Sequence, residues 1–479
     1  MNLANSVERQ PLPSVDSAVS SRFNFWVPIA DGALLYNANT GAIIKFSGHD
    51  SHELAHTLSS KIVEIDGESL PGGLYAQLRD GGFLVPSGTD EVAKIRKRYL
   101  QARAETPIVL TLTSTMDCNL GCYYCYESRS KESLRLADVG AVVDLARSKL
   151  LKTSKKSLHV DWYGGEPLLN LSFIERASTE LQRLCRENTI RYSASVISNG
   201  TQWPENAKQF IFQNCIRQVQ ISFDGLRDNH NRRRRYRSSD RGASSFDEAA
   251  ALVDALLDSV RVDIRVNLDR WNQDDLLPFV DFARSRGWFG RRFPAVIQPA
   301  RLASYSERSA FMRRIELSLE AYDTLRAAVR VQAGGLFKVE ESEVPDGFPY
   351  PKTSVCAALA HDSEVIGPDG LKYRCGLQVG EKHRAVGELH PSHGERAASR
   401  FSDVDWWDAF DPTILPSCSR CSFLPICMGG CPKKHLEKDQ LALAEQGKYW
   451  RRNLPRMIAH AANAHIPDDY TFSETDQFK

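Results

Sequence analysis

Three cysteines stand within eight residues, in the stretch Cys118-Asn-Leu-Gly-Cys122-Tyr-Tyr-Cys125. Thiolates are the usual ligands of iron–sulfur clusters, and a [4Fe–4S] cluster normally takes four of them. Three thiols on one loop would leave one iron free to chelate a small molecule through an amine and a carboxylate. The alternative is structural zinc, which usually draws four ligands from two short motifs, and no fourth Cys or His is near this loop in the sequence. The spacing therefore favours a catalytic cluster.

A second motif, Gly164-Gly165-Glu166-Pro167, follows later in the chain. Two glycines leave backbone carbonyls uncovered, and these can accept hydrogen bonds from an ammonium group. The simpler interpretation is a strand-to-helix turn in which Pro167 opens the helix. The motif gains weight from its place, because it follows the next predicted strand after the cysteine loop.

Six predicted strands alternate with helices from residue 107 onward, which is typical of βα units around a parallel sheet. The strands are expected at residues 108–113, 158–162, 193–198, 218–222, 262–268 and 294–298. Six units are two short of a closed eightfold barrel, so we predict an α/β fold with a partial (β/α)6 TIM barrel. Both motifs would lie at the C-terminal ends of its strands, where reactive groups gather in such folds.

Polar residues stand at or near the ends of the later strands. They are Ser198, Ser222, Arg265 and Asn267. Polar residues also cap sheet edges for purely structural reasons, so the pattern alone does not assign them to a site. A basic run at residues 231–237 could bind a carboxylate or an acidic peptide, although a solvated charged loop is the more ordinary interpretation.

Six more cysteines gather near the C-terminus. They are Cys356, Cys375, Cys418, Cys421, Cys427 and Cys431, the last four with the spacing C-x2-C-x5-C-x3-C. Four of them could hold zinc on sequence grounds alone.

The composition is that of an ordinary globular protein. Hydrophobic residues make up 42% of the 479 residues, charged residues 25%, and the net charge is +1, which argues against a nucleic-acid specialist. No apolar run approaches the roughly 20 residues that cross a bilayer, and residues 1–21 lack the pattern of a secretory signal. We therefore expect a cytoplasmic protein with no nucleic-acid or membrane partner. Because the cytoplasm is reducing and disfavours disulfides, clustered cysteines indicate metal ligands, whereas the isolated Cys185 and Cys215 are expected in the core.

The texture of the sequence predicts five segments. These are a disordered N-terminus (1–21), a small α+β domain with a linker helix (22–105), the barrel (106–305), a helical bridge (306–350) and a cysteine-rich domain (351–479), for which the resemblance described below implies iron–sulfur clusters.

The three-cysteine loop resembles the signature of the radical S-adenosylmethionine (radical SAM) superfamily. The resemblance implies that Cys118, Cys122 and Cys125 hold a [4Fe–4S] cluster that cleaves S-adenosyl-L-methionine to a 5′-deoxyadenosyl radical. It places Tyr124 against the adenine and the Gly-Gly-Glu-Pro turn at the methionine amine. Ser198, Ser222, Arg265 and Asn267 would flank the ribose, carboxylate and adenine. Many relatives have His-Asp where this chain has His230-Asn231, which departs from the pattern.

The C-terminal cysteines resemble the SPASM extension, which carries two auxiliary [4Fe–4S] clusters. The resemblance assigns Cys356, Cys375 and Cys431 to the first cluster, and Cys418, Cys421 and Cys427 to the second. The usual pattern ends with a seventh cysteine, and none follows Cys431 here. The second cluster would then have an open site or a non-cysteine ligand, or would be absent. The nearby candidate ligands are His435, Glu437 and Asp439.

The resemblance implies a peptide maturase that makes an oxidative product such as a cross-link. Its partners would be a ribosomally made precursor peptide with a leader and a flavodoxin- or ferredoxin-type electron donor. Residues 23–85 would bind the leader by adding it as a strand to a sheet edge. Two alternatives stay open: a sulfatase maturase that makes formylglycine and usually begins near the three-cysteine loop, and a non-catalytic metal-stabilised binding protein.

Overall fold

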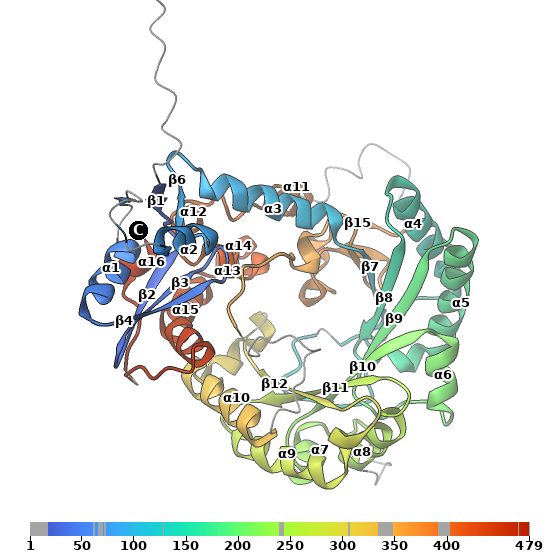
Figure 1. Ribbon diagram of the computed structural model, residues 1–479. Coiled ribbons are helices and arrows are strands. Elements are labelled where there is room, and N and C mark those ends of the chain that lie inside the picture. Colours follow the sequence, from blue (N-terminus) through green and yellow to red (C-terminus); the bar gives the residue numbers. More distant parts are fainter. Residues whose placement is uncertain are drawn as a thin grey trace, which may run out of the picture. The chain divides into compact units, whose positions relative to one another are not determined.

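The computed structural model describes residues 18–60, 63–65, 70, 73–127, 129–238, 244–304, 307–333, 348–390, 403–467 and 469–478. The chain forms two compact units. The terminal unit comprises residues 1–102, 341–354 and 410–479, and the sheet unit comprises residues 103–340 and 355–409. Figure 1 labels the helices and strands of both. No helix among the described residues is long and apolar enough to span a membrane.

The sheet unit is built on six parallel strands, in the order β12-β11-β10-β9-β8-β7. They are β7 (Ile108–Thr115), β8 (Ser157–Gly164), β9 (Arg191–Ser198), β10 (Ile216–Phe223), β11 (Arg261–Leu268) and β12 (Val296–Arg301). Each overlaps one predicted strand, so the α/β class and the mostly parallel sheet are confirmed. Strands β7 and β12 do not pair with each other.

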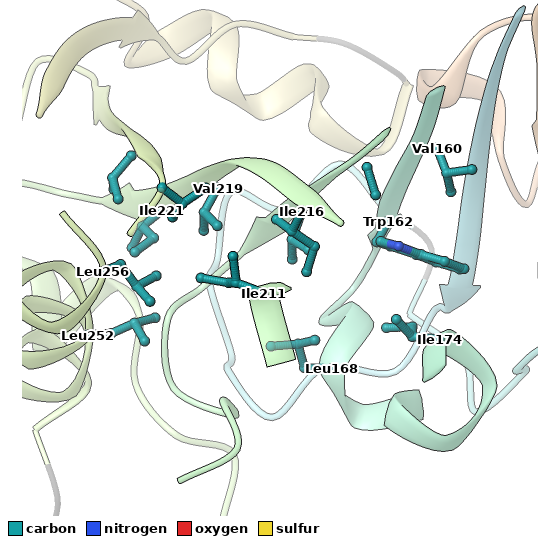
Figure 2. Close-up of a cluster of buried hydrophobic side chains, with 14 of the residues drawn as sticks. Val160, Trp162, Leu168, Ile174, Ile211, Ile216, Val219, Ile221, Leu252 and Leu256 are labelled. Carbon is teal, nitrogen blue, oxygen red and sulfur yellow. The ribbon is translucent and has the colours of Figure 1, made fainter. Parts of the chain in front are cut away.

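Helices connect these strands and cover one face of the sheet. They are α4 (Val139–Lys152), α5 (Leu171–Glu187), α6 (Ala207–Gln213), α7 (Arg227–Arg233), α8 (Ser245–Leu256), α9 (Leu276–Ser285) and α10 (Leu319–Ala333). Figure 2 shows alternate strand residues such as Trp162 and Val219 packed against helix residues such as Ile174 and Leu252. Because side chains alternate along a strand, the opposite face carries polar residues such as His159 and Asp161.

The sheet continues beyond β7. Strand β13 (Glu364–Ile366) pairs parallel to β7, and β14 (Leu371–Tyr373) and β15 (Gly387–Glu388) follow antiparallel. The edge that would close a barrel is therefore occupied by a segment assigned to the C-terminal domain. The predicted helical bridge (306–350) contains a 3₁₀ segment, η6 (Glu307–Arg314), followed by α10. Residues 306 and 334–347 of this bridge lie outside the described residues.

The terminal unit contains two small antiparallel sheets with helices. Their elements are β2 (Asn24–Ile29), β3 (Gly32–Asn37) and β4 (Ile43–Ser47), then β5 (Glu64–Ile65), β1 (Ala18–Ser20) and β6 (Leu84–Pro86), with α1 (His49–Ser60), α2 (Leu74–Asp80) and most of α3 (Glu91–Glu105). The predicted disordered stretch 1–21 falls outside the described residues up to residue 17. Its next three residues form β1, which pairs with β5 and β6, so disorder is wrong for that end.

The chain's C-terminal helices complete the terminal unit. They are α12 (Pro416–Ser419), α13 (Leu424–Cys427), α14 (Pro432–Leu436), α15 (Gln440–Ala461) and α16 (Glu474–Gln477). Phe25 of β2 stacks on Phe423 with ring centroids 5.1 Å apart, and both belong to one core with Leu454 and Phe472. The N-terminal sheet thus shares its core with the segment after residue 410, and residues 351–409 belong largely to the other unit.

Candidate functional site

The sheet unit has a cavity of about 430 Å³ at the C-terminal ends of its strands. All three cysteines of the loop after β7 line it. Seven of the nine predicted cofactor-contact residues also line it, namely Tyr124, Gly164, Gly165, Ser198, Ser222, Arg265 and Asn267. The structure therefore brings together residues from a loop and four strands that are separated by up to 149 positions in the sequence, from Cys118 to Asn267.

The cysteine loop is held by backbone hydrogen bonds, and its three cysteines are half-buried. Gly121 N donates to Arg235 O at 2.7 Å, and Arg237 N donates to Asn119 O at 2.9 Å. Burial raises the pKa of Cys118 to about 12, because a thiolate is poorly solvated there. A bound cation deprotonates a coordinating thiol outright, so this donor set fits a metal-bearing group.

The two glycines of the second motif are required by the approach of the cysteine loop. A Cβ on Gly164, whose φ is +138°, would lie 2.2 Å from Thr115 O, and one on Gly165 would lie 2.4 Å from Asp117 O. Gly165 N donates to Thr115 O at 3.0 Å and Glu166 N to Asp117 O at 2.9 Å. The two motifs are thus joined by backbone hydrogen bonds. Only glycine permits so close an approach, because any Cβ at these positions would clash.

Glu166 and Pro167 lie outside the cavity lining. The Glu166 carboxylate is fully buried and accepts hydrogen bonds from Asn199 N at 2.7 Å, Ser198 Oγ at 3.0 Å and Leu168 N at 3.3 Å. Burial raises its pKa to about 7. Glu166 therefore orders the turn after β9. Pro167 opens the short helix η3 (Pro167–Asn170), as the simpler interpretation of the motif predicts.

Tyr124 is buried in a polar network behind the cysteine loop. Its hydroxyl donates to Asp224 Oδ1 at 2.7 Å and accepts from Arg234 Nη1 at 2.7 Å. Arg233 bridges Asp224 at 2.9 Å and Asp269 at 3.0 Å. The expectation of a solvated loop is therefore wrong for Arg233 and Arg234, because both guanidiniums are paired and buried.

Arg234 is a cavity residue that the sequence did not single out. It lies near the Cys122 thiol as well as Tyr124. Nothing in a run of four arginines distinguishes the buried ones from the exposed ones before the fold is known.

At His230-Asn231, where many relatives have His-Asp, the Asn231 side chain accepts a hydrogen bond from Phe246 N at 3.0 Å, at the start of α8. His230 is fully buried between Phe223 and Phe246.

Two further lining residues were also missed. Asn199 Nδ2 lies 3.8 Å from Cys118 Sγ and donates to Asn119 Oδ1 at 2.8 Å. Glu127 is half-buried beside Tyr163, and the desolvation of its carboxylate raises its pKa to about 7. Asn199 directly follows Ser198, so the strand-end pattern could have included it.

The terminal unit has its own cysteine-lined cavity, of about 350 Å³. Cys418, Cys421 and Cys427 line it, together with His435, whereas Cys431 is exposed and does not. Cys356 and Cys375 belong to the sheet unit, where they precede the 3₁₀ helices η7 (Ala357–Leu359) and η8 (Gly376–Gln378). The structure thus gathers three of the six C-terminal cysteines. Among the described residues, no three His, Cys, Asp or Glu side chains are placed to hold a single metal ion.

Residues 112–283 match the model of the radical SAM superfamily. The chain contains a radical SAM domain. The matched range runs from the end of β7 through α9 and includes the three-cysteine loop and the Gly-Gly-Glu-Pro turn. Enzymes of this superfamily use S-adenosylmethionine and a [4Fe–4S] cluster.

Two curated proteins resemble the chain well beyond the radical SAM domain. The serine-type anaerobic sulfatase-maturating enzyme of Klebsiella aerogenes is 25% identical over 360 residues, which cover 71% of this chain and 84% of that protein. The mycofactocin maturase MftC of Mycolicibacterium smegmatis is 25% identical over 337 residues, covering 68% and 78%. The chain is thus a radical SAM enzyme related to maturases.

A solved structure shares the fold. It is native anSMEcpe with bound AdoMet, which aligns with a TM-score of 0.54 at 17% identity and covers 74% of this chain and 100% of that chain.

Proposed function

We propose that this radical SAM enzyme matures a ribosomally made precursor peptide and that its product is oxidative, such as a cross-link. The observation that carries the proposal is the cavity in which the three-cysteine loop meets the Gly164–Gly165 turn at the strand ends. Similarity to the sulfatase-maturating enzyme over 71% of the chain, and to the mycofactocin maturase over 68%, supports this class of reaction.

Different residues around this cavity would bind the cluster and the methionine end of S-adenosylmethionine. Cys118, Cys122 and Cys125 would hold the [4Fe–4S] cluster, whose chemistry when bound is the one-electron reduction of S-adenosylmethionine. The backbone at Gly164 and Gly165 would accept hydrogen bonds from the methionine amine.

Charged and polar side chains would orient the rest of the cofactor. The Arg234 guanidinium is a fixed cation in the cavity wall and would pair with the methionine carboxylate. Tyr124 would lie along the adenine, with its hydroxyl fixed by Asp224 and Arg234. Ser198, Ser222, Arg265 and Asn267 complete the polar wall and would bind the ribose and the remaining adenine edge.

The C-terminal cysteines would hold two auxiliary clusters, the first on Cys356, Cys375 and Cys431 and the second on Cys418, Cys421 and Cys427. Such clusters can take up an electron from a substrate radical, which favours an oxidative product. A flavodoxin- or ferredoxin-type protein would supply the starting electron. The described part of residues 23–85 would contact the leader, and its antiparallel β2-β3-β4 sheet offers an edge for strand addition.

The test is coexpression of the full chain with a short peptide encoded beside its gene, followed by mass spectrometry of the peptide. A loss of two hydrogens that requires the enzyme is expected. A sulfatase-derived peptide converted to formylglycine would instead establish the sulfatase-maturase alternative, which the Klebsiella relative supports. Failure of the reconstituted, reduced protein to form 5′-deoxyadenosine would leave only a non-catalytic role.

A further inference from the structure

The cavity of the terminal unit contains a fourth metal-binding side chain beside its three thiols. Cys418, Cys421, Cys427 and His435 all line it. From this arrangement we infer that the His435 imidazole is the fourth protein ligand of the second auxiliary cluster. The inference rests on the proposed presence of that cluster and names the residue that replaces a missing cysteine.

The three cysteines line one cavity; Cys421 is buried, and Cys418 and Cys427 are half-buried. Uncharged buried thiols are poor partners for one another, whereas iron binds them as thiolates. A [4Fe–4S] cluster normally takes four protein ligands, so one position remains to be filled.

Hydrogen-bond donors surround the Cys427 sulfur. The Lys352 ammonium, the Trp450 indole N–H and the amides of Gly429 and Gly430 lie around this sulfur. The Trp450 Nε1 atom is buried near this sulfur without reaching full hydrogen-bond geometry to any described residue. Gly429 and Gly430 have φ angles of +77° and +73°, a backbone conformation that favours glycine.

The His435 ring is held in place by two contacts. It lies on α14, packs against Phe410 with ring centroids 5.3 Å apart, and its Nε2 lies 2.8 Å from Gly429 O. Because a carbonyl can only accept, Nε2 carries the proton, and Nδ1 of the neutral ring keeps a lone pair. Metal-binding histidines almost always donate their other N–H to a carbonyl or carboxylate in this way.

The other candidate ligands are engaged elsewhere. Glu437 pairs with the Lys433 ammonium, and Asp439 binds Lys434 Nζ at 2.9 Å and Ala442 N at 3.2 Å at the start of α15. Neither carboxylate lines the cavity. Three glutamines do line it, Gln440, Gln446 and Gln477, but a neutral amide is a weaker ligand for iron than imidazole.

An imidazole ligand has an electrochemical consequence. Replacing a thiolate by a neutral ring removes one negative charge from the cluster, and less negative iron–sulfur clusters have higher reduction potentials. The second cluster would therefore accept an electron more readily than its all-cysteine counterpart, as an oxidative reaction requires.

The experiment isolates this cluster in the full-length protein by changing the other cluster cysteines, Cys118, Cys122, Cys125, Cys356, Cys375 and Cys431, to Ala. After anaerobic reconstitution with iron and sulfide, about four irons per chain are expected. Pulsed electron paramagnetic resonance of the reduced protein should detect one strongly coupled nitrogen, and labelling histidine with 15N should change that coupling. His435→Cys should keep the iron, lose the coupling and move the potential to more negative values.

Two further variants make the result decisive. His435→Gln, whose amide can still donate to Gly429 O, should lose the coupling, whereas Glu437→Gln should retain it. Four irons without nitrogen coupling, or coupling that persists in both His435 variants, overturns the assignment while leaving the cluster in place. Absence of iron overturns the cluster and its ligand together. S-adenosylmethionine cleavage is measured on the unmodified enzyme and does not depend on these variants. A failed ligand assignment can therefore be told apart from a failed proposed reaction.

Discussion

The two cysteine-lined cavities are built from similar thiol sets but are completed in different ways. In the sheet unit, the loop with Cys118 meets a glycine turn and a buried arginine supplied by later strands and helices. In the terminal unit, Cys418 meets a histidine and a tryptophan supplied by the helices that follow it. On the proposed assignments, the first arrangement would leave a cluster position for a small molecule, and the second would fill that position with a protein side chain. The cysteines alone would not reveal the difference, because the neighbouring side chains decide it.

The strongest test of this comparison removes one set of thiols at a time. Changing Cys118, Cys122 and Cys125 to Ala should reduce 5′-deoxyadenosine formation to background, because the cluster that reduces S-adenosylmethionine would be lost. Changing Cys418, Cys421 and Cys427 to Ala should preserve cleavage but abolish peptide modification. Chromatographic assay of 5′-deoxyadenosine and peptide mass spectrometry give the two readouts, with Cys215→Ser as the control. Cleavage that survives the first triple change would contradict the assignment of the cavity.

The glycine turn gives the next largest effect. Gly164→Ala would place a Cβ 2.2 Å from the Thr115 carbonyl. We expect a loss of about 1–3 kcal/mol in the free energy of unfolding, as in overpacked sites, together with loss of cluster iron. Gly140→Ala is the matched control, since nothing lies within 4 Å of its Cβ position in α4, and it should stabilise by about 0.5–1 kcal/mol. Denaturant unfolding and iron analysis measure both; equal stability for the two variants would mean that the loop can move aside.

Arg234 tests whether the buried cation is part of the cofactor site. Arg234→Gln removes the charged partner of the Tyr124 hydroxyl and one of the two arginines that pair with Asp224, while the Arg233–Asp224 pair stays. Breaking a buried pair outright typically costs about 3–5 kcal/mol, and the retained Arg233 should keep the cost below that range. We expect weaker binding of S-adenosylmethionine by calorimetry, by at least about tenfold, which corresponds to 1.4 kcal/mol. Arg232→Gln, on the exposed side of α7, should change stability by less than about 0.5 kcal/mol. Unchanged affinity in Arg234→Gln would restrict this residue to a structural role.

The smallest effect should come from Trp450 in the terminal unit. Trp450→Phe keeps most of the ring but removes the N–H near Cys427, so the free energy of unfolding should change by at most about 1 kcal/mol. The reduction potential of the second auxiliary cluster should shift to more negative values, since a donor to its sulfur is lost. Spectroelectrochemical titration measures the shift. An unchanged potential would show that the indole does not reach the cluster.

Features that are contiguous in the sequence could be predicted from it. The six parallel strands follow from short apolar segments between helices, and the cysteine loop and glycine turn were recognised from their residues alone. Arg234 could not be selected from its run, because its burial depends on Asp224 and Tyr124, which are distant in the sequence. Glu166 was expected in the cavity, yet it is directed by Asn199 N and Ser198 toward the turn behind it.

The domain division was also beyond the sequence pattern. Short apolar segments near residues 25 and 423 give no sign that they pack together, because such pairing is decided by the shape of two surfaces and not by periodicity. The predicted boundary near residue 351 instead followed the first C-terminal cysteine. The compact units separate Cys356 and Cys375 from the later four cysteines.

The core that joins Phe25 to Phe423 has a consequence for how the protein is made. Strands β2, β3 and β4 are synthesised nearly four hundred residues before the helices that cover Phe25, since Phe25 packs on Phe423. The radical SAM sheet can fold as a unit while the N-terminal strands still lack half of their core, because domains generally form in the order of synthesis. Closing so long a separation should make the terminal unit the slow step of folding. If the proposed clusters are present, iron would then reach Cys418, Cys421 and Cys427 after translation, and later than it reaches the loop at Cys118.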